Sequence, residues 1–498
     1  MPRYLAVYCL TIAACFASSA RADVTYEQAK EGDNDIEVVR MTVTPAAEPV
    51  PALRYRLVAR DIDLQAGNAA PYYYRALLDS TRTMDRVRKK YGDEFDTWYF
   101  GGGDVIPIGN LPLDKVRKAV EMSSSPIRDY LQDAMLRRNC DWALDMESLR
   151  GPNVIAVLLP EFQECRELGR ILSLQSRLAT AERRYDDAIE AMRMNYRLGR
   201  DVATGPILVC GLIGIAIDGI ANLTVTELIA APDSPNLYWA LTELPQPPID
   251  MRPAARFEID FGPRMFPFIH HAEATERAPE EWNRLYTHAF RDLAKVGEGG
   301  ISWRNDTAVA IGAIGTALVG YSHAKAQLIA QGKDRGRVEK MAVGQVMAIY
   351  TERMCQQFAD DFQKLWYVPF SDMRKYDDEL GKRLRDAGPF GGGQHREVMP
   401  IAAQLLPAMQ WARTAQVRLE REVAALRVIE ALRIYAAEHG GGLPKTLDEI
   451  TAVPVPPNPA TGKPFVYRLD GKTAVLELPR SDGIPASNRR YEIQIAKK

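Results

Sequence analysis

Between about Ala69 and Gly388, apolar residues recur at intervals of three and four positions, and this spacing constrains the fold more than any other feature of the sequence. It is clear in stretches such as RALLDSTRTMDRVRKKYG, which begins at Arg75, and VEKMAVGQVMAIYTERMCQQFADDFQKLW, which begins at Val338. The interval matches the turn of an α-helix with one buried face. We therefore predict a helical domain over residues 69–397.

The helices of this domain are expected to pair as hairpins. Tyr185 and Ala188 stand where the tetratricopeptide repeat places an aromatic and a small packing residue on its second helix. The other consensus positions are not matched, and no second copy follows at the repeat's period of about 34 residues. The predicted fold class is mainly α, either as irregular hairpins that resemble tetratricopeptide repeats or as an irregular bundle.

Two segments interrupt the helical pattern. Residues 23–68 are predicted to be an extended lead-in with strands, because IEVVRMTV and PALRYRLVA carry β-branched residues and alternate between apolar and polar positions. The stretch Ala230–Pro253 contains six prolines, which exclude one continuous helix. Its apolar cluster is expected to plug the bundle rather than to form a ledge for a ligand: Leu237, Tyr238, Trp239 and Leu241.

The first 22 residues, MPRYLAVYCLTIAACFASSARA, have the pattern of an export signal. One early positive charge, Arg3, precedes an apolar run, and the segment closes with the small-residue cleavage pattern Ala20-Arg21-Ala22. In an alternative interpretation, IAAC resembles a bacterial lipobox, and Cys15 becomes a lipidated N-terminus. The mature protein is thus expected in the periplasm or outside the cell, or anchored to a membrane through Cys15.

Charge and hydropathy disfavour two classes of partner. The chain has 63 basic and 65 acidic residues, and cleavage after residue 22 removes two arginines and no acid, so the mature chain is mildly acidic. Nucleic acid is therefore not expected as a partner, because it calls for clustered basic residues. The strongest candidate for a later membrane span, ILVCGLIGIAI from Ile207, stops at Asp218 and is shorter than the about 20 residues required. We expect a buried helix there and no transmembrane span in the mature chain.

Residues 398–498 are predicted to form a small α+β module. A long helix is expected from about Met399 to His439, with a kink or a restart at Pro407 and glycines at its end. FVYRL and AVLEL alternate on either side of Asp470-Gly471, a strong hairpin signal, and YEIQI can add a third strand. The predicted module is a long helix followed by a three-stranded antiparallel meander.

This module resembles the C-terminal half of type II secretion pseudopilins over about Leu426–Ile495. The resemblance is carried by LRIYAAEHGGGLPKTLDEI and NPATGKPFVYRL, in which a helix ends in Tyr-x-x-Glu, Gly and Leu-Pro follow, and Pro-x-x-Gly-x-Pro leads into a strand. Pseudopilins begin with a hydrophobic membrane helix, whereas this chain begins with an export signal and a long helical region. The resemblance implies a related soluble module within an exported bacterial helical protein, and envelope or secretion-system proteins as partners.

One stretch carries a candidate nucleophile. Gly320-Tyr321-Ser322-His323-Ala324 differs by one residue from the GxSxG elbow of α/β-hydrolases. If this stretch formed such an elbow, Ser322 would be the nucleophile that attacks an ester. The elbow must follow a buried strand, however, and the preceding TAVAIGAIGTALVG has helical spacing. An exposed helical serine is the competing interpretation.

Metal and cofactor motifs are weak. His270, His271 and His288 lie near acidic residues, but adjacent histidines on a helix point about 100° apart, and no HExxH or CxxC spacing accompanies them. The glycine runs at 101–103 and 391–393 lack the Lys-Ser/Thr of a phosphate loop. We predict no metal and no cofactor, with the three histidines as the candidates if a metal binds.

Four cysteines remain in the mature chain. Cys140 and Cys165 lie on either side of the expected turn RGPN and would come level in an antiparallel helical hairpin, so a disulfide between them is one hypothesis. Cys210 lies in an apolar run and is expected to be a buried thiol.

These features together favour an exported, non-catalytic binding or scaffold protein of the bacterial envelope. Two alternatives stay open at this point. One is a secreted serine hydrolase using Ser322, and the other is an accessory subunit of a secretion or envelope assembly that docks through residues 398–498.

Overall fold

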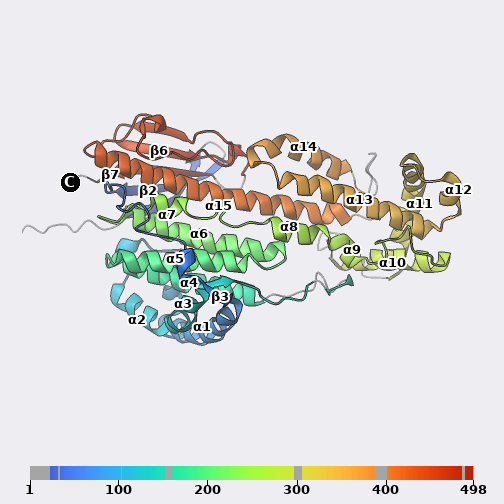
Figure 1. Cartoon of the computed structure of the whole chain (residues 1–498), viewed down its shortest axis with the longest axis horizontal. Coiled ribbons are helices and arrows are strands. Elements are labelled where there is room, and N and C mark those ends of the chain that lie inside the picture. Colours follow the sequence, from blue (N-terminus) through green and yellow to red (C-terminus); the bar gives the residue numbers. More distant parts are fainter. Residues whose placement is uncertain are drawn as a thin grey trace, which may run out of the picture.

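The computed structural model describes residues 23–31, 34–101, 104–146, 148–151, 160–296, 306–386, 401–484 and 488–496. The predicted export signal and Cys15 lie outside these ranges. The protein is mainly helical, as predicted. It is elongated, with a sheet over one end of its longest helix and layers of further helices beneath it (Figure 1). The predicted strands at both ends of the chain belong to this one sheet.

Five strands form a mixed sheet in the order β1-β2-β7-β6-β5. The strands β5 (Val466–Asp470), β6 (Thr473–Leu478) and β7 (Arg489–Ile495) are antiparallel neighbours, which confirms the predicted meander. Asp470 pairs with Thr473 across a two-residue turn in which Gly471 has a φ of 63°.

The N-terminal strands complete the sheet from the other end of the chain. The strands β1 (Asp23–Glu31) and β2 (Asn34–Val43) form an antiparallel hairpin, and β2 runs parallel to β7. The predicted strand in PALRYRLVA is wrong, because residues 51–58 form turns and bends. Prolines at 45, 49 and 51 lack the N–H that a further ladder needs, so the pairing ends with β2.

Helix α15 (Ile401–Glu438) runs beneath the sheet without a break at residue 407, so the predicted restart there is wrong. The loss of one backbone hydrogen bond near its start does not end so long a helix. It ends as predicted: Gly440 and Gly441 have φ of 60° and 89°, and the Gly441 N–H donates to the Ala436 carbonyl at 2.7 Å.

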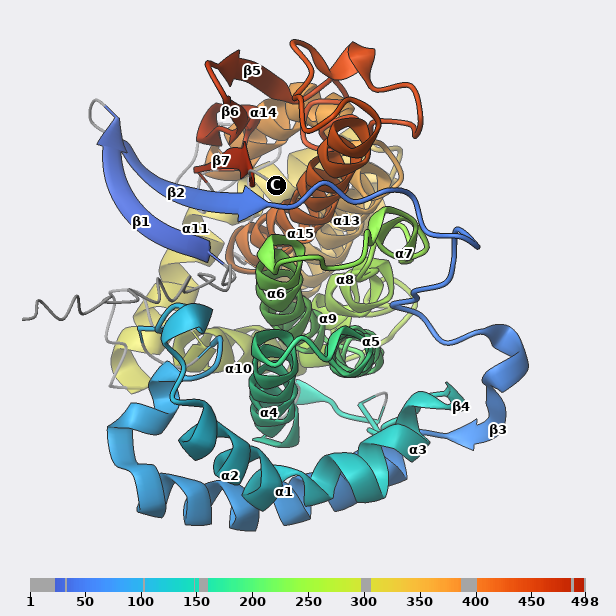
Figure 2. The same ribbon diagram turned by 90° about the vertical axis from the view of Figure 1, so that its left-hand side faces the viewer.

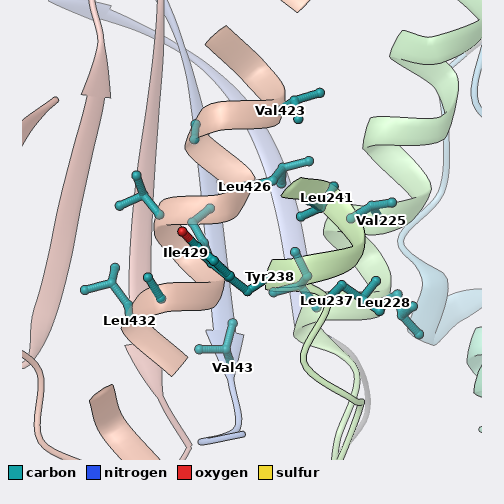
Figure 3. Close-up of a cluster of buried hydrophobic side chains, with 14 of the residues drawn as sticks. Val43, Val225, Leu228, Leu237, Tyr238, Leu241, Val423, Leu426, Ile429 and Leu432 are labelled. Carbon is teal, nitrogen blue, oxygen red and sulfur yellow. The ribbon is translucent and has the colours of Figure 1, made fainter. Parts of the chain in front are cut away.

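Buried side chains from α15, α6 (Leu208–Ala230), the connector that leads into and includes α7 (Tyr238–Thr242), and β2 form the core under the sheet (Figure 3). The connector's aromatic cluster is part of this core, and Leu237, Tyr238 and Leu241 are fully buried, which confirms that it plugs the bundle. The labelled members of the core are Val43, Val225, Leu228, Leu237, Tyr238, Leu241, Val423, Leu426, Ile429 and Leu432.

A buried ion pair fastens three distant segments beneath the sheet. Arg433 and Glu430 of α15 are both fully buried, and their closest atoms are 3.0 Å apart. The Arg433 guanidinium also donates to the carbonyls of Thr44 at 2.9 Å and Ser234 at 2.8 Å. Glu430 accepts from the Leu237 N–H at 3.0 Å. The end of β2, the connector and α15 therefore share one polar network inside the apolar core.

Helices α4 (Pro160–Ala181), α5 (Tyr185–Val202) and α6 (Leu208–Ala230) pack together as consecutive antiparallel neighbours. The backbones of α5 and α6 approach closely at Gly199 and Gly214, where a Cβ on Gly214 would lie 2.5 Å from the Gly199 carbonyl oxygen. On the far side of α4 lies a layer with its own apolar core. It contains β3 (Gln65–Asn68), α1 (Ala70–Tyr91), α2 (Leu113–Ser123), α3 (Gln132–Met135) and β4 (Arg137–Asn139).

Helix α6 lies at the centre of the molecule. Within the described residues it is the one helix long and apolar enough to cross a membrane, and 72% of its most apolar window is buried inside the protein. This confirms the expected buried helix and extends it to Ala230. Two acids of α6 are buried: Glu227 pairs with buried Arg177 at 2.8 Å, whereas one carboxylate oxygen of Asp218 has no hydrogen-bond partner among the described residues. Burial raises the pKa of Asp218 well above its ordinary value.

The end of the molecule opposite the sheet is helical and has a third apolar core. In chain order the helices after α6 are α7 (Tyr238–Thr242), α8 (Arg252–Ile259), α9 (Phe261–Met265), α10 (Pro279–Val296), α11 (Asp306–Ala330), α12 (Arg335–Lys340), α13 (Val343–Leu365) and α14 (Phe370–Asp386).

Candidate functional site

A cleft of about 670 Å³ lies between the sheet and the helices beneath it. Most of its lining residues come from β1, β2 and β7 of the sheet and from α4, α6 and α15. Figure 2 shows how these strands and helices are arranged. We name it the arginine cleft, because four arginines line it against three acids: Arg166, Arg418, Arg480 and Arg489, with Asp35, Glu37 and Glu422. Its volume is that of a small-molecule site.

Arg489 is the fixed charge of the cleft. It lies on the central strand β7, its guanidinium is 2.6 Å from Glu37 of β2 and 3.6 Å from Glu422 of α15, and its side chain is mostly buried. Burial lowers the pKa of Arg489, but Tyr491, Glu422 and Glu37 together raise it by more, so the group stays charged. The pairing of β2 with β7 is what brings Glu37 to this arginine.

Arg166 and Arg418 carry charges that are not neutralised. Arg166 projects from α4 and Arg418 from α15, both are partly buried, and neither makes a hydrogen bond or an ion pair with the residues that the structure describes. Nε of Arg166 is buried without a hydrogen-bond partner among the described residues, and a donor that has lost water without gaining a partner costs free energy. An oxyanion in the cleft would supply that partner with matching planar geometry.

Asn222 of α6 adds an unused donor to the same cleft. The side chain is 4% exposed, and its amide oxygen accepts from the Tyr196 hydroxyl at 2.6 Å. That bond fixes the amide so that Nδ2 lies on the other side, where it has no partner in the described part of the protein. Buried amide donors are almost always paired, so this one marks a position for an acceptor.

The remaining lining of the cleft is mixed, with Gln28, Thr226, Asn488 and Tyr491 beside apolar side chains. No atom lies within 4 Å of the position that a Cβ on Gly219 would occupy, so the surface of α6 carries no side chain at this point of the cleft. Five apolar side chains from α6 and α15 contribute to the lining: Ile215, Ile220, Leu223, Leu419 and Leu426. The cleft thus combines a mainly polar and charged lining with a smaller apolar surface from α6 and α15.

Ser322 is in the middle of helix α11, exposed. The sharp strand-to-helix turn of a nucleophile elbow is therefore not formed around it. The neighbouring His323 points its Nε2 at the Tyr350 hydroxyl, 3.1 Å away. The structure places Ser322 as the exposed helical serine of the competing interpretation.

The three candidate histidines are only partly brought together. His270 and His271 lie in the turn between α9 and α10, not on a helix, and share a cluster with Glu352 of α13. His288 is an exposed residue of α10 outside this cluster. The predicted divergence of His270 and His271 is wrong, because the two residues lie in a turn and their ring centroids are 3.8 Å apart.

The described cysteines are free thiols, so the structure does not contain the Cys140–Cys165 bridge. The expected helical hairpin does not form, because Cys140 follows the short strand β4 while Cys165 lies within α4. Cys165 is buried, and burial raises its pKa. Cys210 is buried as expected, and burial raises its pKa to about 12.

Comparison with protein-family models gave no match, and neither the curated proteins nor the solved structures gave a significant match to this chain.

Proposed function

We propose that this chain is an exported binding protein of the bacterial envelope that holds a small molecule with an oxyanion, a carboxylate or a phosphate, in the arginine cleft. The observation that carries the proposal is that three residues lining one cleft have unpaired donors: the guanidinium groups of Arg166 and Arg418 and the Nδ2 of Asn222 have no partner among the described residues. The export signal supports the location, and the donor set supports binding.

The arrangement gives each group a distinct role. Arg166 and Arg418 line the same cleft from α4 and α15, so the two helices supply donors for an anion bound in it. Arg489 is already satisfied by two acids and contributes a fixed positive charge rather than free donors. The apolar side chains of α6 and α15 cover the carbon skeleton of the ligand.

Isothermal titration calorimetry of the mature protein with inorganic phosphate and with succinate tests the proposal. We expect saturable binding of at least one of the two, with an affinity that falls as salt rises. Each charge-assisted hydrogen bond contributes about 1.5–3 kcal/mol, which corresponds to a loss of at least about tenfold for each arginine removed.

The variant R166Q/R418Q removes both free charges and keeps polar side chains of similar length. The matched control is R75Q/R82Q, because Arg75 and Arg82 are exposed residues of α1 and lie outside the cleft. Loss of binding in the cleft variant alone supports the proposal. Equal affinity in both variants, or no saturable binding of either probe by the wild type, contradicts it.

The same protein preparation tests the location. The full-length chain is expressed in a bacterial host that can export it, and the intact mass of the purified protein is measured. The mass distinguishes a chain that begins at Asp23 from one lipidated at Cys15. A chain that retains residues 1–22 contradicts export.

A further inference from the structure

The turn between α9 and α10 places two imidazoles and a carboxylate together, outside the arginine cleft. His270 and His271 lie in the turn, and Glu352 faces them from α13. One ligand atom from each of the three residues lies within 4.8 Å of the other two. This grouping is independent of the proposed function.

The backbone of the turn explains how adjacent histidines face the same way. Ile269 and Ala272 are fully buried in the core on either side of the pair, which anchors the turn. His271 has a φ of 59°, in the left-handed region, so the chain reverses at that residue. The two ring centroids are therefore 3.8 Å apart, whereas neighbouring side chains on a helix diverge.

Glu352 is held in position by the same turn. Its Oε1 accepts the backbone N–H of His271 at 2.9 Å and lies 3.6 Å from Nδ1 of His270. The Glu352 side chain is only 23% exposed, whereas that of His270 is 56% exposed. The carboxylate is thus a fixed ligand, and the imidazoles are free to adjust.

We propose that His270, His271 and Glu352 bind a divalent transition metal ion of the zinc type. Two imidazoles with one carboxylate are a ligand set that zinc uses in proteins, with the remaining positions open to water. Three atoms at the 4.8 Å limit would lie about 2.8 Å from their common centre, so a shift of at most about 0.7 Å reaches the zinc bond lengths of about 2.0–2.2 Å. Oε1 of Glu352 and Nδ1 of His270 are already 3.6 Å apart. Rotation of the two exposed rings provides that movement. Mg²⁺ and Ca²⁺ prefer oxygen ligands and fit this set poorly.

The surrounding charges permit a cation at this position. Arg353 follows Glu352 in the sequence, but its guanidinium faces Glu273 at 3.3 Å and Gln331 at 2.8 Å. Lys333 also pairs with Glu273. A bound ion joins the turn after α9 to helix α13, so it connects two elements that meet through the apolar core.

Calorimetry with ZnCl₂ on the purified mature chain, prepared without a polyhistidine tag, tests this site. We expect one Zn²⁺ per chain that excess Mg²⁺ does not displace. The variants H270Q and E352Q each remove one ligand, and the amide introduced by E352Q retains an oxygen that can accept the His271 N–H. We expect each to weaken binding by more than about tenfold, since loss of an outer-shell partner alone costs about 10–100-fold.

The matched control is H288Q, which removes an exposed histidine outside the cluster and is expected to leave the affinity unchanged. Circular dichroism verifies that all three variants fold. The proposal is overturned if the wild type shows no saturable Zn²⁺ binding, if Mg²⁺ displaces the ion, or if H270Q and E352Q bind as tightly as H288Q does.

Discussion

Replacing Arg433 by methionine should destabilise the protein more than loss of any exposed arginine. The side chain is fully buried, and it supplies the counter-charge for Glu430 and donors for the Thr44 and Ser234 carbonyls. Methionine fills much of the volume but leaves Glu430 as a buried charge without its guanidinium. Breaking a buried pair from one side costs about 3–5 kcal/mol. We expect the free energy of unfolding of R433M to fall by that amount.

Urea titration followed by circular dichroism at pH 7 measures the loss. The matched control is R193M, since Arg193 pairs with Glu190 at the same spacing on α5 but is partly exposed. That change is expected to cost no more than about 1 kcal/mol. The double variant E430Q/R433M should recover part of the loss, because a neutral amide replaces the stranded carboxylate and can still accept from the Leu237 N–H.

Equal losses in R433M and R193M would refute this reasoning. So would a double variant less stable than R433M, since the cost would then lie in lost packing rather than in the unpaired charge of Glu430.

Three further predictions concern helix packing, pH and the thiols. G214A is expected to destabilise the protein by at least about 1–3 kcal/mol, because its Cβ would lie 2.5 Å from the Gly199 carbonyl oxygen. G219A on the same helix has free space for its Cβ and should be neutral or stabilising by up to about 1 kcal/mol. Thermal unfolding of the two variants measures this difference in stability. Burial raises the pKa of Asp218, so its contribution to stability is present below the ordinary value of about 3.9 and is lost as pH rises through the folded-state pKa. D218N should therefore gain stability relative to wild type as pH rises, by up to about 1–3 kcal/mol, and a constant difference from pH 4 to pH 8 argues against this. Titration of denatured protein should give four thiols per mature chain with and without prior reduction, and two fewer without reduction would restore the Cys140–Cys165 bridge.

Local patterns predicted the local elements well. Apolar spacing gave the helical class, and Asp470-Gly471 located the β5–β6 turn, because both signals come from residues close together in the chain. The alternation in residues 36–43 indicated a strand but carried no information on its neighbour. The pairing of β2 with β7 depends on residues at opposite ends of the sequence, and a single sequence does not specify that contact.

The candidate sites were harder to predict for the same reason. Arg166 and Arg418 each lie on a long helix, where an arginine is ordinarily a solvated surface residue. The two arginines line one cleft only because α4, α6, α15 and the sheet pack together in the folded protein. His270 and His271 were identified from the sequence, but they were expected on a helix, where neighbouring side chains diverge. The left-handed backbone of His271 instead brings the two rings together.

The sheet order also sets a constraint on how the chain is made. The central strand, β7, is the last described strand to be synthesised, whereas β1 and β2 are the first. Until residues 489–495 emerge, β2 presents one edge of unpaired backbone donors and acceptors and lacks its central neighbour. A chain that stops before residue 489 lacks the middle strand of its sheet, so the sheet can close only after β7 has been made.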